Sequence, residues 1–191
     1  MNYDNDYIAE KLRKWEKYIT TFSLPKWEQI PDFGLYMEQV LALLKDYIDY
    51  LPPELKEEQS FTSTAVNNYV RNKMIPEPVK KKYYRIHIAY LIMIYTLKQS
   101  MSLSLIQKII PLGISEDEVR TLYVSYASHY RKAANYYVET VRDLAGNILK
   151  HDGASEYAVN DTSDLIIMST VFSGLSRLLA EKLLLLDDKN E

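Results

Sequence analysis

The chain has 191 residues, of which 47% are hydrophobic and 26% charged, and its formal net charge is −3. This is the composition of an ordinary globular protein, long enough for one large domain or two small ones, and its slightly acidic balance argues weakly against nucleic-acid binding. The absence of cysteine excludes disulfides and thiolate-bound metal and favours a cytoplasmic location, while the polar N-terminus does not resemble a secretory signal.

Helical periodicity dominates the front of the chain, so we expect an all-α fold. Helices are predicted over residues 6–21, 35–50, 63–72, 85–100 and 102–110, with proline-rich breaks between them. The loop 24–33 carries four large apolar residues that are expected to pack down: Leu24, Trp27, Ile30 and Phe33. The helix 85–100 is apolar around most of its circumference, which predicts burial on several sides.

Two longer helices are predicted after Pro111. Ser115 is a candidate N-cap for a helix that extends to about residue 150, because three acidic residues follow it where the helix dipole favours anions. A last helix, from 161 or 162 to about 186, contains the most apolar run of the chain. Arg177, Glu181 and Lys182 interrupt this run, so we interpret it as a buried amphipathic helix rather than a membrane span. We expect a helical domain over 1–111 and a long-helix hairpin over 112–191 for dimerisation or effector binding.

The sequence carries no recognisable catalytic or metal-binding motif. The three histidines are far apart, and no HExxH, P-loop, GxSxG or GxGxxG pattern is present. His87, on an apolar helix, is better explained as a core histidine than as a ligand. The tyrosines at helical spacing between 123 and 137 favour packing, with a ligand pocket or dimer seam as the alternative. We therefore expect neither an enzyme nor a bound cofactor.

Six cations lie between residues 71 and 85, against a single anion, Glu77. In the helix 63–72 the apolar residues share one face, so the Asn and Arg side chains project from the other. Asn can bond adenine and Arg guanine, while Lys and Arg hold phosphate. The alternative is a solvated charge run. The candidate DNA-binding residues are Thr64, Asn67, Asn68, Arg71, Lys80, Lys81, Lys82 and Arg85.

The segment from 24 to 110 resembles an uncharacterised bacterial domain family of unknown function. The resemblance is carried by LPKWEQIPDFGLYMEQV, by NNYV and by KKKYYRIHIAYL. The family has an LPxWxxIPD segment followed by LYMxQV, an NNYV helix and a KKxYxxxHxAYL helix. Membership implies no reaction.

The same region is similar, more distantly, to MerR-type winged helix-turn-helix regulators. The matching features, in that family's order, are Tyr69, the turn at 74–76, Tyr83, core positions Leu91 and Ile94, and the segment 103–106. Lys73 stands where the MerR pattern has glycine. The resemblance implies a helix-turn-helix, a basic wing and a long dimerising helix, which residues 115–150 would supply.

We therefore expect an all-α protein with a helix-turn-helix-like N-terminal part and a long C-terminal helical hairpin. The expected function is a cytoplasmic transcriptional regulator that binds double-stranded DNA as a homodimer, with a small-molecule effector as a further partner and no membrane association. The helix 63–72 would enter the major groove and the turn 80–85 would contact phosphates. One alternative is a non-enzymatic helical protein-interaction module, and another is a helical enzyme without a known motif.

Overall fold

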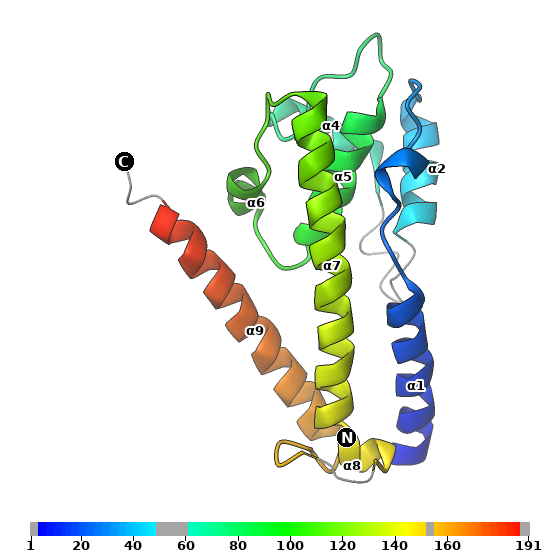
Figure 1. Cartoon of the computed structure of the whole chain (residues 1–191), viewed down its shortest axis with the longest axis vertical. Coiled ribbons are helices and arrows are strands. Elements are labelled where there is room, and N and C mark those ends of the chain that lie inside the picture. The colour runs from blue at the N-terminus through cyan, green and yellow to red at the C-terminus, as the bar shows by residue number, and fades with distance from the viewer. Residues whose placement is uncertain (1–3, 49–60, 152–154, 188–191) are drawn as a thin grey trace. The chain divides into compact units, whose positions relative to one another are not determined.

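The computed structural model describes residues 4–48, 61–151 and 155–187. Within these ranges the chain is all-α (Figure 1), as the sequence predicts, and β pairing is limited to two isolated antiparallel bridges. The predicted end of the second helix, at residues 49 and 50, lies outside the described residues.

The chain divides into two compact units that differ from the predicted division at residue 111. The central unit is Ser23–Tyr130, and the terminal unit combines Met1–Phe22 with Arg131–Glu191. The helix α7 (Glu116–Leu144) runs through the boundary at residue 130. Its first half is bonded to the central unit, where the Tyr126 and Thr96 hydroxyls lie 2.6 Å apart. Its second half is bonded to the terminal unit, where Arg142 pairs with Glu16.

The central unit is built around α5 (Arg85–Leu97), which is buried continuously from His87 to Tyr95. Three helices contact it directly or through one another: α2 (Met37–Tyr47), α4 (Ser63–Arg71) and α6 (Leu103–Ile109). The burial predicted for this helix is confirmed. A helix apolar on all sides is stable only when other elements cover it, so α5 is the scaffold of the unit.

The loop 24–33 packs against the central unit as predicted, except at one residue. Leu24, Trp27 and Ile30 are buried, and Trp27 begins a short 3-10 helix, η1 (Trp27–Gln29). The hydroxyl of Tyr123 in α7 donates to the carbonyl oxygen of Pro25 at 2.8 Å. Burial raises the pKa of Tyr123, so this hydroxyl stays protonated and keeps its bond to the loop. The prediction for Phe33 is wrong, because its side chain is 62% exposed.

The terminal unit comprises α1 (Asn5–Thr21), the second half of α7, α8 (Gly146–Leu149) and α9 (Thr162–Asp187). The long helix predicted to reach residue 150 ends at Leu144 and is followed by the short helix α8. The small core of the unit is formed by these buried residues: Ala9, Leu144, Ala145, Ile148, Leu149 and Leu165.

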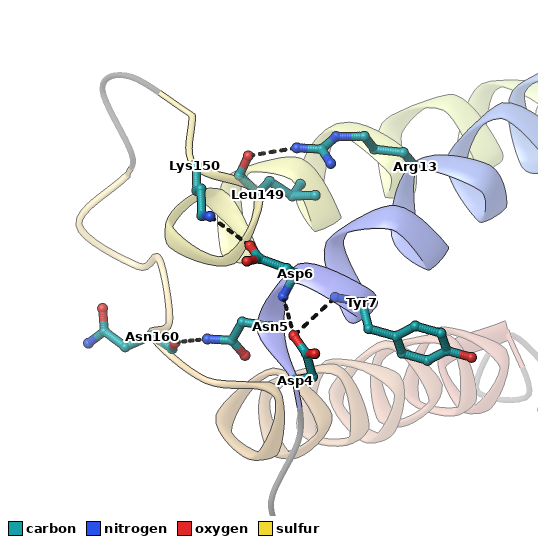
Figure 2. Close-up of polar contacts among 8 residues, drawn as sticks. All are labelled: Asp4, Asn5, Asp6, Tyr7, Arg13, Leu149, Lys150 and Asn160. Atoms are coloured by element: carbon teal, nitrogen blue, oxygen red, sulfur yellow. Dashed lines mark hydrogen bonds and ion pairs between the residues drawn. The ribbon is translucent and has the colours of Figure 1, made fainter.

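Polar contacts join the start of α1 to the α8 end of the terminal unit (Figure 2). Asp4 caps α1 by accepting from the backbone N–H groups of Asp6 and Tyr7. The Asp6 carboxylate pairs with Lys150 at 2.6 Å, which lowers the pKa of Asp6. The Arg13 guanidinium donates to the Leu149 carbonyl oxygen at 3.0 Å. This ion pair is exposed and therefore adds little stability.

The predicted burial of the last helix is wrong. Among the residues of α9 from 162 to 184, whose burial the structure describes, only Thr162 and Leu165 are buried, whereas Leu175, Leu178 and Leu179 are each at least 58% exposed. Within the described chain, Thr162–Leu184 is the one helix long and apolar enough to cross a membrane by length and composition, and 6% of that window is buried. Its apolar residues therefore have some role other than filling the core of this chain.

Candidate nucleic-acid interface

One face of α4 is polar and lies at the surface of the central unit. Thr62 caps the helix by accepting from the Ala65 N–H at 3.1 Å, and Val66 and Tyr69 are buried beneath it. Four outward residues share one side of the helix, because positions 64 and 68, and 67 and 71, are four apart, and 64 and 67, and 68 and 71, are three apart. We call this side the polar stripe; it consists of Thr64, Asn67, Asn68 and Arg71.

The polar stripe is exposed at Thr64, Asn67 and Arg71 and half-buried at Asn68. The Arg71 guanidinium donates to the Asn68 side-chain oxygen at 2.8 Å. This bond holds the guanidinium along the helix surface and leaves its other N–H groups free to donate outward, because an Arg side chain has five donors. The stripe thus offers amide and guanidinium groups on one face of the helix.

The C-terminus of α4 ends in a Schellman motif with a lysine at its left-handed position. The Met74 N–H donates to the Tyr69 carbonyl at 2.8 Å, and the Lys73 N–H donates to the Val70 carbonyl at 3.0 Å. Lys73 has a φ of 53°, a conformation that glycine adopts at lower cost. The buried Met74 and Ile75 follow and anchor the chain below the helix end. Nearby, the Gln107 side chain donates to the Asn72 carbonyl at 2.8 Å and ties α6 to the same end.

The left-handed lysine gives a stability prediction. We expect Lys73→Gly to stabilise the chain by up to about 1 kcal/mol, because it removes the Cβ strain while part of the gain is offset by the greater freedom of glycine in the unfolded state. Denaturant unfolding followed by circular dichroism measures the change. Lys73→Ala is the matched control, since it removes the charge but keeps the Cβ, and it should give no gain. A destabilised Lys73→Gly variant would show that this conformation is not strained.

A two-residue hairpin follows, with lysines at its tip. Val79 and Lys82 exchange both backbone hydrogen bonds at 3.0 Å, and the two residues between them, Lys80 and Lys81, have φ values of 50° and 64°. This is the backbone of a tight hairpin turn, where Asn and Gly are the least strained residues. We call residues 79–82 the lysine hairpin. In Figure 1 the connection between α4 and α5 extends beyond both helices, at the end of the central unit where α4 lies.

The base of the lysine hairpin is fixed to the segment before α2. Leu35 and Tyr83 form an antiparallel bridge with two hydrogen bonds of 2.8 Å, and both residues are buried. Gly34 allows this approach, because a Cβ there would lie 2.9 Å from the Lys82 Cβ. The Lys82 ammonium lies over the Tyr36 ring, 5.2 Å from its centre. The two tip lysines are therefore carried by a hairpin with an ordered base.

His87 contacts the backbone on both sides of the lysine hairpin. Its Nδ1 accepts from the Tyr84 backbone N–H at 3.0 Å, and its Nε2 lies 3.1 Å from the Glu77 carbonyl oxygen. A carbonyl oxygen can only accept, so Nε2 carries the proton and the ring is neutral. The side chain is buried, and this burial lowers the pKa of His87. The predicted core histidine therefore also links the segments before and after the hairpin, and we call His87 with these two contacts the clasp.

The clasp predicts that the fold becomes less stable at acid pH. Unfolded His87 protonates near pH 6.5, whereas the folded ring stays neutral to lower pH, so the unfolded state binds more protons and the free energy of unfolding decreases as the pH falls below about 6.5. One proton gives a slope of at most about 1.4 kcal/mol per pH unit. We expect His87→Asn, whose side-chain oxygen can accept from Tyr84, to remove this slope in denaturant unfolding between about pH 5.5 and 7.5. The exposed His129→Asn is the control; if that variant removes the slope instead, the clasp is not its source.

Of the eight candidate residues, five are exposed and three, Asn68, Lys82 and Arg85, are half-buried. Lys80 and Lys81 are exposed and Lys82 is half-buried. Arg85 is engaged in the fold: its Nε donates to the Ile30 carbonyl at 2.8 Å, and its guanidinium lies 5.7 Å from the centre of the Trp27 ring. This arginine joins α5 to the loop 24–33, so it is a structural residue rather than a free cation.

Sequence reasoning missed the elements that shape this site. Gly34 and Leu35 precede the predicted site by about thirty residues and carry no chemical signal, so their pairing with Tyr83 was not predicted. The hairpin itself could have been recognised, because VKKK between Pro78 and Tyr83 has the length of a two-residue turn. No group of three or more His, Asp or Glu side chains that could hold a metal occurs in the described part of the chain.

A second feature of the central unit is a pocket of about 930 Å³ between the 24–28 loop and α7. Leu24, Trp27 and Val124 contribute apolar surface, and the Arg120–Glu28 ion pair, at 2.7 Å, lies among the lining residues. Its volume suits a small molecule or a peptide side chain. None of the eight candidate DNA-binding residues lines it, whereas Tyr123, one of the tyrosines for which the sequence left a ligand pocket open, does.

Comparison with known proteins places the front of the chain in a family. The model of a family described as "Domain of unknown function (DUF1836)" matches residues 25–133, which include α4, the lysine hairpin and the pocket. Neither the curated proteins nor the solved structures gave a match to this chain.

Proposed function

The chain belongs to this domain family of unknown function, and from the surface described above we propose that it is a DNA-binding regulator. In this proposal α4 enters the major groove of double-stranded DNA, and the lysine hairpin contacts the phosphate backbone beside it. The observation that carries the proposal is the polar stripe of α4, followed in the chain by a hydrogen-bonded hairpin tipped with two exposed lysines.

The backbone strain and the exposure of the two lysines at the hairpin tip favour a functional role for them over a structural one. Lys80 and Lys81 both occupy left-handed positions, at a cost on the order of 1 kcal/mol each relative to glycine. They make no contribution to the core, since both are exposed. Two adjacent ammonium groups held on an ordered loop suit phosphate oxygens, which fix the orientation of a protein on DNA.

The polar stripe supplies groups that can read base edges. Asn67 presents an amide that can bond adenine N6 and N7, and Arg71 presents a guanidinium that can bond guanine O6 and N7. Thr64 and Asn68 lie on the same side and complete the proposed contact set with Lys82 at the hairpin base. Arg85 is not in this set, because its Nε donates to Ile30, its guanidinium lies over the Trp27 ring, and it pairs with Asp32 at 3.8 Å.

DNA binding is tested by measuring whether the immobilised full chain retains a pool of random duplexes at low and at high salt. We expect the full chain to retain duplexes at low salt and to lose them steeply as salt rises. The reason is that Lys and Arg side chains displace counterions from the DNA phosphates, and the release of these counterions becomes less favourable at high salt. Bovine albumin, also acidic, is a suitable negative control. If the pool is not retained even at low salt, α4 and the lysine hairpin do not form a DNA interface.

The pocket beside α7 favours a second candidate, a protein- or effector-binding module without DNA. Its apolar residues and its Arg120–Glu28 pair would suit a ligand with an apolar body and a polar end. Both functions can coexist in one regulator, in which the pocket holds the effector. Trp27 lines the pocket, so quenching or enhancement of its fluorescence by a partner, in a chain that does not retain DNA, would favour the second candidate.

A further inference from the structure

The exposed apolar residues of α9 share one face of the helix. At 100° per residue, the apolar positions from 167 to 183 gather on the side of Leu175, while the opposite side carries Ser169, Ser173 and Arg177. Ala180 is an exception on the polar side, as are Ile166 and Leu184 just outside this range. The exposed members of the apolar face are Ile167, Val171, Phe172, Leu175, Leu178, Leu179 and Leu183. Such a face is stable in water only when something covers it.

Two opposite charges mark the ends of this face. Asp164, Met168, Val171, Leu175, Leu178 and Lys182 follow one another at intervals of 4, 3, 4, 3 and 4 residues. That is the spacing of a heptad seam, and we call these six residues the α9 seam. Met168 is half-buried and packs in part against the core of the terminal unit, whereas Val171, Leu175 and Leu178 are exposed. In the described part of the chain neither the Asp164 carboxylate nor the Lys182 ammonium has an ionic partner, whereas Arg177 and Glu181, off the seam, pair with each other at 2.7 Å.

We propose that the α9 seam pairs with the same seam of a second copy of this chain, with the two helices antiparallel. In this arrangement Asp164 meets the partner's Lys182, Met168 meets the partner's Leu178, and Val171 meets the partner's Leu175; symmetry repeats the three layers in reverse. All three pairs fit one register, because the residue numbers in each add to the same value. The paired length, 18 residues at 1.5 Å each, is about 27 Å.

The charges select this occupant and this direction. A parallel pair in register would place Asp164 against the partner's Asp164 and Lys182 against the partner's Lys182, and like charges across a seam are destabilising. The antiparallel pair neutralises all four charges at its two ends and leaves a continuous apolar centre. Each contact is made twice, as a two-fold symmetric dimer requires.

A lipid bilayer covers the face less well, although Thr162–Leu184 is long and apolar enough to span one. In a helix that spans the bilayer, Asp164 and Lys182 would lie near the two headgroup regions, but Arg177, about 6 Å along the helix from the centre of the span, would lie in hydrocarbon. Helices that lie on membranes have a polar face rich in Lys and Arg, whereas α9 has Ser, Thr and one neutralised ion pair there. A second copy gives each seam charge an opposite charge as its partner, which a bilayer does not.

The chain has no native cysteine, so introduced thiols report the pairing directly. We expect the full chain with Met168→Cys, mixed with the full chain with Leu178→Cys, to form a disulfide-linked dimer under mild oxidation. Each variant alone should form little of it, because two copies of residue 168 are about 15 Å apart along an antiparallel pair and a disulfide needs Cα atoms within about 7 Å. Cross-linking by each variant alone would indicate a parallel pair, and no cross-link in the mixture would overturn the pairing.

Charge reversal tests the same proposal without a cross-link. Asp164→Lys sets lysine against lysine at both ends of the seam, and we expect the dimer Kd from sedimentation velocity to rise about tenfold. The double variant Asp164→Lys/Lys182→Asp restores the opposite pairs and should return to within about twofold of wild type. If the double variant associates no better than the single one, or if wild type is monomeric and sediments with phosphatidylcholine–phosphatidylglycerol vesicles, the seam does not pair with a second copy. Neither test contains DNA, so both are independent of the proposed DNA binding.

Discussion

The double variant Lys80→Ala/Lys81→Ala is expected to bind duplex DNA at least about tenfold more weakly at low salt than the wild-type chain. Both ammonium groups are exposed at the tip of the lysine hairpin and contribute nothing to the core, so their loss should leave the fold intact. Each phosphate contact adds about 0.9 to the slope of log affinity against log salt. The slope should therefore decrease by about 2 for each bound subunit, as measured by fluorescence anisotropy at several salt concentrations.

The control for this variant must lose the same net charge elsewhere. Lys17 and Lys132 are both exposed and lie in the terminal unit, so Lys17→Ala/Lys132→Ala changes the net charge equally and leaves the hairpin untouched. We expect its salt slope to match that of wild type. Equal losses in the two double variants would mean that binding depends on net charge alone and that the hairpin has no special role.

The second large effect is expected at Arg71, and it concerns sequence preference rather than salt. If the guanidinium bonds a guanine in the major groove, Arg71→Ala should reduce discrimination at that base pair by about 1–3 kcal/mol, or roughly 5- to 150-fold. Arg71→Lys keeps the charge but loses the planar fork. We therefore expect it to retain most of the affinity for random duplex and to lose the preference.

A selection from a random duplex pool, repeated with wild type, Arg71→Ala and Arg71→Lys, measures this preference. The wild-type chain should enrich a base pair that neither variant enriches. Asn68, which receives a hydrogen bond from Arg71 at 2.8 Å, offers a check, because Asn68→Ala should weaken the preference less than Arg71→Ala. If Arg71→Lys selects the same sites as wild type, Arg71 contacts phosphate and not a base.

Much of the fold could be predicted because its signals are local. Capping residues such as Thr62 and Ser115, prolines at the breaks, and apolar periodicity are all read from neighbours in sequence, and α4, α5 and α6 lie where these patterns indicate. The division into units could not be read in this way. It depends on which half of α7 contacts which segment, through pairs such as Tyr123 with Pro25 and Arg142 with Glu16, which are about a hundred residues apart.

The candidate site was predictable in composition but not in construction. The polar stripe follows from helical spacing once Val66 and Tyr69 are taken as the inner face. Arg85 shows the limit of this reasoning, since a cation in a basic segment can serve the fold. Its bond to Ile30 and its cation–π contact with Trp27 join segments some 55 residues apart. The exposed face of α9 was missed because periodicity shows that residues share a face and does not show what covers it.

Backbone hydrogen exchange of the full chain, with and without a selected duplex, tests most directly whether α4 and the lysine hairpin form a DNA interface. We expect DNA to slow exchange in α4 and in residues 79–82 and to leave α9 unchanged. The amides of α4 after its first turn are already hydrogen-bonded, so slower exchange there would mean that DNA stabilises the helix. Slower exchange at the hairpin tip would mean that DNA shields these amides from solvent directly. Slowing confined to α7 or α9, with α4 and the hairpin unaffected, would contradict the proposed interface.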